Sequence, residues 1–185
     1  MGGDSKKLDT LSTSNCLSLS LLPHSFEHLT SLSILSVDNS KITKLPDGVG
    51  ELVKLRCLSL RNCRWIRELL ESIGKLGSSL EELDISGTCV SELPDSFGNL
   101  WRLRVLKIDY CFLFPSFIWG LDTLEEIHAS SCRNLEGEIP GDVGKLINLR
   151  ILRLQDSAIS SLPPEIKHLP KLETLDPLRC DMLSE

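Results

Sequence analysis

One spacing of leucine and isoleucine recurs along the whole chain and limits the folds that it can adopt. The clearest copy covers residues 80–100, LEELDISGTCVSELPDSFGNL, in which Leu80 and Leu83 are three apart and Leu83 and Ile85 two apart. A polar position and a Leu-Pro pair follow. Neither a helical nor a strand period fits the whole copy, whereas a short strand, a turn and a partly helical return do.

The same pattern can be laid along most of the sequence. Copies begin at Leu32, Leu55, Leu80, Leu103, Leu124, Leu149 and Leu172, at intervals of 21 to 25 residues. A degenerate earlier copy begins near Leu8. The period and the LxxLxLxx(N/C) pattern are typical of leucine-rich repeats. We therefore predict a degenerate N-terminal repeat with a flexible start at 1–31, six repeats at 32–171 and a truncated repeat at 172–185.

The alternation within each copy predicts the architecture. Side chains two apart on a strand share a face, so Leu83 and Ile85 point inward while Glu82 and Asp84 point into solvent. One strand cannot bury its apolar side alone, and stacked repeats turn single residues into columns. One predicted column is Leu35, Leu58, Leu83, Leu106, Ile127, Leu152 and Leu175. The expected fold is an α/β solenoid, with a concave parallel sheet and with loops and short helical turns on the convex face.

A second column follows the strands. It contains Cys16, Ser40, Cys63, Thr88, Cys111, Cys132, Ser157 and Cys180. Small side chains with a donor suit a turn whose backbone groups need partners. These cysteines could instead carry metal or redox chemistry, but an inward-facing ladder fits better, because free cysteine is often buried.

Composition excludes several classes of protein. The formal net charge of -6 argues against a nucleic-acid binder with a general basic surface. No apolar run approaches the ~18 residues of a membrane span, and the start, MGGDSKK, is not a signal peptide. The cysteines are odd in number and form no CxxC pair. We expect a soluble protein in a reducing compartment, with no nucleic-acid or membrane partner.

No enzyme motif occurs in the sequence. Phosphate loops, GxSxG elbows and HExxH helices are missing. His24 and His28 are four apart, as in a metal pair, but no third ligand lies near them in sequence, so we interpret them as solvated. We predict neither catalysis, nor a cofactor, nor a metal site.

The outward positions of the strands offer a protein-binding surface. The candidates are Arg56, Arg61, Glu82, Asp84, Arg104, Lys107, Tyr110, His128, Arg153 and Gln155, with Trp119 nearby. Basic and acidic rows alternate along them. A ladder of ion pairs between neighbouring strands explains this alternation best for any single residue. The face as a whole remains the expected contact surface, since Tyr, Trp and Arg are enriched in binding hot spots.

Several segments are similar to those of a known family. SLEELDISGT, LPDSFGNLWRLRVLKI, LEEIHASSCRNLEGEIP and INLRILRLQDSAISSLPPEIKHLPKLETLD resemble the leucine-rich-repeat part of plant intracellular nucleotide-binding immune receptors of the Toll/interleukin-1-receptor-like class. The resemblance implies recognition of pathogen effectors, autoinhibition by the repeats and a cytosolic or nuclear location. It also implies protein partners: a pathogen effector, a host target or other domains of the same receptor.

Two features leave alternatives open. The unit LEGEIP at residues 135–140 also resembles the repeats of plant cell-surface receptors. The last copy is broken at Pro177 and shows no polar closing repeat, which indicates a fragment or self-association through that end. A free-standing scaffold or signalling adaptor outside immunity is the alternative function.

Overall fold

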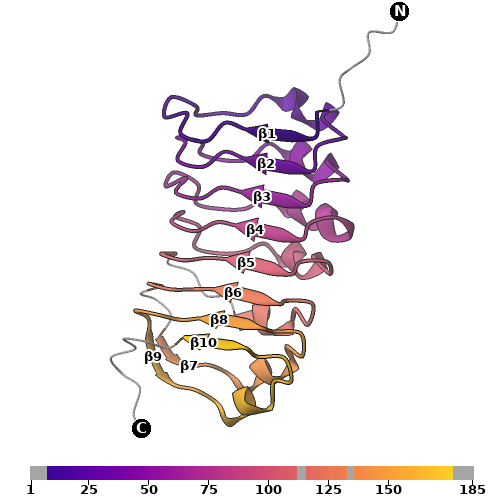
Figure 1. The fold of residues 1–185 in the computed structure, drawn as a ribbon. Helices are drawn as coiled ribbons and strands as arrows, with labels where there is room; N and C mark the ends of the chain where they lie inside the picture. The colour runs from indigo at the N-terminus through magenta and orange to yellow at the C-terminus, as the bar shows by residue number, and fades with distance from the viewer. Residues whose placement is uncertain (1–7, 112–115, 133–135, 177–185) are drawn as a thin grey trace, which may run out of the picture.

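The computed structural model describes residues 8–111, 116–132 and 136–176. Eight short strands form one parallel sheet, in the order β1-β2-β3-β4-β5-β6-β8-β10. They are β1 (Thr10–Ser12), β2 (Ile34–Ser36), β3 (Cys57–Ser59), β4 (Glu82–Asp84), β5 (Val105–Lys107), β6 (Glu126–His128), β8 (Ile151–Arg153) and β10 (Thr174–Asp176). Figure 1 shows the repeats stacked one on the next, each with its strand on the same side of the coil.

The register of the sheet confirms the predicted leucine column. The middle residues of neighbouring strands are paired in an unbroken series: Leu11, Leu35, Leu58, Leu83, Leu106, Ile127, Leu152 and Leu175. From Leu35 to Leu152 each member is at most 1% exposed. Burial of a leucine side chain contributes about 1.5–3 kcal/mol, so this column carries much of the stability.

Short helices cover the opposite side of the coil, as the Leu-Pro pairs predict. They are η1 (His24–His28), η2 (Asp47–Glu51), η3 (Glu71–Ser78), η4 (Asp95–Asn99), η5 (Ser116–Gly120), η6 (Gly141–Lys145) and η7 (Pro164–His168), all of the 3₁₀ type. In η4, the N–H of Phe97 donates to the Pro94 carbonyl at 2.9 Å. Five residues after a proline suffice for such i→i+3 bonds but leave little room for α-helical ones.

A second, two-stranded sheet was not predicted. It joins β7 (Glu136–Glu138) and β9 (Ala158–Ser161) in parallel and lies apart from the main sheet at the C-terminal end (Figure 1). The pairing shifts register between Gly137 and Glu138. A single parallel bridge, between Glu68 and Glu92, occupies a similar position between two earlier repeats.

The polar column is an inward ladder in the middle of the coil. Cys63, Cys111 and Cys132 are buried, and their thiols donate to the carbonyls of Val37, Ile85 and Ile108 in the preceding repeats, at 3.2, 3.1 and 3.0 Å. Burial raises the pKa of the Cys132 thiol to about 12. Burial also raises the pKa of the Cys111 thiol, so Cys111 and Cys132 stay protonated and serve as hydrogen-bond donors.

The column departs from the prediction at its N-terminal end, where Cys16 is exposed. A thiol in the ladder donates to a carbonyl of the preceding repeat, and the described residues contain no repeat before that of Cys16. The predicted ladder member Cys180 and the break at Pro177 lie outside the described residues.

The residue before each member of this column has a left-handed backbone. These residues are Asn15, Asn39, Asn62, Gly87, Tyr110, Ser131 and Asp156, with φ between 52° and 67°. Glycine and asparagine adopt this conformation readily, whereas bulky side chains rarely do. The left-handed residue reverses the chain after the strand and fixes the rim of the sheet.

Candidate protein-binding surface

The ten predicted binding residues lie along the outward face of the sheet and its rim, at different depths. Arg56, Arg61, Arg104, Tyr110 and Arg153 are exposed, Glu82, Lys107, His128 and Gln155 are partly buried, and Asp84 is buried. The prediction that Asp84 points into solvent is therefore wrong: it is only 8% exposed. Its carboxylate accepts a hydrogen bond from the Ser86 N–H at 2.9 Å, which ties it to the turn that follows β4.

An arginine–glutamate column runs along the edge that precedes the strands. Each arginine pairs with the glutamate of the next repeat: Arg56 with Glu81 at 2.8 Å, Arg104 with Glu125 at 2.6 Å and Arg150 with Glu173 at 2.9 Å. The hydrogen bonds from Arg56 and Arg150 lower the pKa of the Glu81 and Glu173 carboxyls. The alternating charges thus form the predicted ladder.

A second group of charges lies at the centre of the sheet. The ammonium group of Lys107 contacts Glu82 at 2.5 Å, and the His128 ring contacts Glu126 at 3.1 Å. Burial alone would lower the pKa of Lys107, but the hydrogen bond to Glu82 and the charges of Glu82, Asp84 and Glu126 raise it. Lys107 is therefore held as a cation among three carboxylates.

Several predicted binding residues, among them Arg61, Arg153 and Tyr110, take part in no ion pair within the described residues. The side chain of Arg153 is exposed and forms no ion pair within the described residues. Tyr110 is 66% exposed and has a φ of 60°. Its N–H donates to the Ser130 carbonyl at 2.9 Å, so the sheet holds the strained backbone in place. A tyrosine in this conformation costs of order 1 kcal/mol or more.

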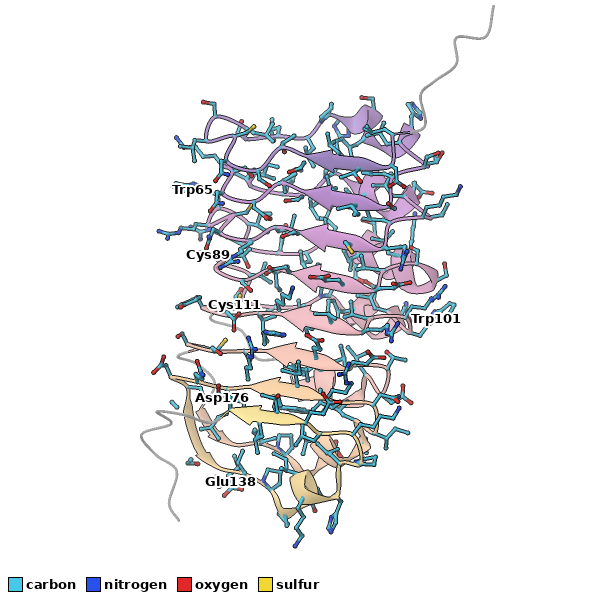
Figure 2. All side chains as sticks on the ribbon, in the orientation of Figure 1. Trp65, Cys89, Trp101, Cys111, Glu138 and Asp176 are labelled. Atoms are coloured by element: carbon cyan, nitrogen blue, oxygen red, sulfur yellow. The ribbon has the colours of Figure 1, made fainter. Side chains whose placement is uncertain are left out.

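The repeat pattern did not identify several exposed apolar residues, and it placed Trp119 near the binding surface, where it does not lie. Trp119 is buried at 1% exposure, so it is no binding residue. Several exposed apolar side chains lie on the two long edges of the sheet: Leu17 and Trp65 follow the strands, and Val53, Trp101 and Ile147 precede them. Figure 2 shows Trp65 and Trp101 on opposite edges. Their positions in the repeat could have identified them, because both fall between the apolar anchors.

Neither a metal-binding cluster nor a membrane-spanning helix is found among the described residues. No three histidine, cysteine or acidic side chains in these residues gather as a metal site would require, and His24 and His28 are both exposed. None of the helices described is both long and apolar enough to cross a bilayer.

The chain matches known proteins in sequence and in structure. Residues 47–139 match the family model "Leucine-rich repeat region". The chain is 31% identical over 162 residues to TMV resistance protein N of Nicotiana glutinosa, a match that covers 85% of this chain and 14% of that protein. The chain therefore spans a small part of the relative's length.

Two solved structures share the fold. A leucine-rich-repeat protein of Leptospira interrogans superposes with a TM-score of 0.80 at 28% identity, over 86% of this chain and 40% of that one. The leucine-rich-repeat domain of the type III effector XopL gives 0.74 at 25% identity, over 92% and 69% of the two chains. The predicted solenoid is thus confirmed, and so is the resemblance to a plant resistance protein. The chain belongs to the leucine-rich-repeat family of protein-interaction modules.

Proposed function

We propose that the chain is a non-enzymatic recognition module of a plant intracellular disease-resistance protein. In this proposal the repeats bind a pathogen effector or a host target, and they contact other domains of the receptor in its resting state. Such a module acts in the cytosol or the nucleus. The similarity to TMV resistance protein N supports the receptor class.

The observation that carries a binding role is the backbone of Tyr110. The other left-handed positions hold asparagine, glycine, serine or aspartate, which tolerate φ above zero better than an aromatic residue does. An exposed tyrosine at such a position costs stability without burying its ring. Strain that the fold does not need points to a function for the side chain, and tyrosine is a frequent binding hot spot.

Arg153 extends this candidate surface across the sheet. Its strand β8 lies two strands from β5, which precedes Tyr110. Strands are ~4.8 Å apart, so one partner can contact both residues. An arginine without a counter-ion can form a new bidentate pair with a partner's carboxylate. Arg56 and Arg104, by contrast, would first have to break their ion pairs with Glu81 and Glu125.

A comparison of three forms of the chain tests the binding surface. The immobilised native chain, a Tyr110→Asn/Arg153→Glu variant and a Val53→Asn/Lys54→Glu control capture proteins from a plant extract. The control removes one exposed apolar residue and reverses one cation on the opposite edge. We expect proteins captured by the native chain and the control to be lost from the variant. Equal capture by all three forms would show that the concave face does not bind these proteins.

Sequencing the native transcript tests the receptor assignment separately. We expect Toll-like and nucleotide-binding segments in the same reading frame. A short frame that encodes only repeats with a polar closing unit would contradict the receptor assignment and favour a free-standing scaffold.

A further inference from the structure

The turns of the first three repeats enclose a recess on the edge that follows the strands. This post-strand pocket has a volume of about 270 Å³ and lies between Leu17 and Trp65, with Lys41 and Arg64 beside them. Leu17, Lys41 and Arg64 each follow a member of the polar column, so they occupy the same position in successive repeats. The pocket is therefore built by stacking, and it is separate from the concave face discussed above.

Two cations occupy neighbouring turns in this pocket without a counter-ion. Lys41 and Arg64 are exposed, none of the residues lining the pocket is acidic, and neither side chain forms an ion pair within the part of the chain that the structure describes. Like charges in adjacent repeats repel and lower stability. On a chain with a net charge of -6, such a local excess of positive charge requires an explanation.

The recesses on the opposite edge differ from the post-strand pocket in how their cations are paired. Two hollows there share Glu81 and Arg102 and are lined by further arginines. Arg56 contacts Glu81 at 2.8 Å, Arg102 contacts the same carboxylate at 3.9 Å, and Arg104 contacts Glu125 at 2.6 Å. The arginines of those hollows are already neutralised by carboxylates of the chain, whereas the cations of the post-strand pocket are not.

The walls of the post-strand pocket suit a ligand with an apolar part. Leu17 and Trp65 are 65% and 57% exposed. The amides of Asn39 and Asn62 also line it. Each donates one N–H along the stack, to Asn15 at 3.1 Å and to Asn39 at 3.0 Å. An amide has a second N–H, and in neither residue is it used within the described structure, so both can donate to a ligand oxygen.

We propose that the post-strand pocket binds an acidic segment of a protein partner, in which a carboxylate side chain lies beside an apolar one. The carboxylate would pair with Lys41 and Arg64 and accept from the asparagine amides, while the apolar neighbour packs on Trp65 and Leu17. Inorganic phosphate lacks the apolar part. A nucleic acid presents a continuous row of phosphates and is bound by a patch or stripe of many cations, whereas two cations line this pocket. The proposal does not depend on the function assigned to the concave face.

The three tryptophans allow a direct test by NMR of the 185-residue chain. Indole N–H signals of Trp65, Trp101 and Trp119, assigned from single Trp→Phe variants, report the pocket, the opposite edge and the buried interior. The probes are the tetrapeptide acetyl-LDLD-amide and its neutral counterpart acetyl-LNLN-amide. We expect LDLD to shift the Trp65 signal saturably and to bind at least about tenfold more tightly than LNLN. Trp101 and Trp119 should not move.

Charge-reversed variants complete the test. Lys41→Glu/Arg64→Glu should abolish the Trp65 shift, whereas Lys54→Glu/Lys167→Glu, which changes the net charge equally at exposed lysines elsewhere, should retain it. An unchanged Trp119 signal verifies the fold of each variant. Equal shifts from both peptides, an equal shift from inorganic phosphate or from a single-stranded oligonucleotide, or a Trp65 signal that moves with protein concentration alone would each overturn the proposal. The peptide comparison holds for the native chain even if a variant fails to fold.

Discussion

In the first three repeats the left-handed residue of each turn is an asparagine, whereas later repeats place glycine, tyrosine, serine and aspartate there. The backbone is the same in both halves. In the N-terminal half, Asn15, Asn39 and Asn62 bond to one another along the coil. In the C-terminal half this ladder is absent from the described contacts. The first half thus uses the position for hydrogen bonds along the coil, and we propose that the second half leaves it available for binding.

The sheet shows the same division. The outward residues of β2 and β3 are serine, isoleucine and cysteine, while those of β4, β5 and β6 include Glu82, Asp84, Lys107 and Glu126. Hydrogen bonds of hydroxyl groups dominate the first half; for example, Ser59 donates to Asp38 at 2.6 Å. Ion pairs dominate the second. A continuous leucine column joins both halves, so the difference lies in the polar residues alone.

The largest effect should come from breaking the column at the junction of the halves. Leu83 is fully buried in β4, the first charged strand. Leu83→Ala should lower the free energy of unfolding by about 2–5 kcal/mol, because a cavity remains. Repeats are coupled only to their neighbours, so we also expect the halves to unfold separately. Urea denaturation followed by circular dichroism and by hydrogen exchange would show this. A single transition with unchanged midpoint would contradict it.

The next largest loss of stability should come from substituting an asparagine of the ladder. Asn39 lies in its middle, with a φ of 56° and bonds to both neighbours. Asn39→Ala should cost about 2–3 kcal/mol, since it removes two hydrogen bonds and puts a Cβ-bearing residue without a compensating amide in the left-handed region. Asn39→Gly retains the backbone conformation and should cost less. Thermal denaturation of both variants separates the two contributions, and equal losses would show that the backbone conformation is unimportant.

Charge reversal should distinguish the two parts of the ion-pair network. Lys107 faces Glu82, Asp84 and Glu126, so Lys107→Glu adds a fourth carboxylate and should cost about 1–2 kcal/mol. Arg104 is exposed and forms its ion pair among the described residues with Glu125, so Arg104→Glu should change stability by about 0.5 kcal/mol or less. Both losses should shrink at high salt. If Arg104→Glu were the more damaging, the edge column rather than the centre would hold the sheet.

The repeat period predicted the column, the strand order and the convex helices because each depends on apolar spacing alone. The repeat period did not predict the burial of individual side chains, which depends on their neighbours in the folded chain. Trp119 occupies the position of Gly98 in the preceding repeat, yet Gly98 is exposed and Trp119 is only 1% exposed. The buried Asp84 carboxylate accepts a backbone N–H, which offsets the cost of removing it from water.

The candidate site was only partly predictable for the same reason. Alternating charges indicated ion pairs, and Arg56, Arg104 and Lys107 are found in them. The left-handed backbone of Tyr110 and the unpaired cations at Lys41 and Arg64 depend on three-dimensional neighbours. The roles of the ten binding residues and the three-part division of the chain stay predictions.

The smallest expected effect is a gain in stability, in contrast to the loss expected for Asn39→Ala. Tyr110→Asn places a residue that tolerates positive φ where a tyrosine is strained, so it should stabilise the chain by about 1 kcal/mol. The tyrosine ring is 66% exposed and contributes little packing to offset this gain. Thermal denaturation of the native chain, Tyr110→Asn and Tyr110→Phe measures it, with Phe as the control that keeps the strain. A stabilised variant that has also lost its partner would show that this turn sacrifices stability for recognition, whereas a destabilised one would place Tyr110 in the scaffold with the asparagines of the first half.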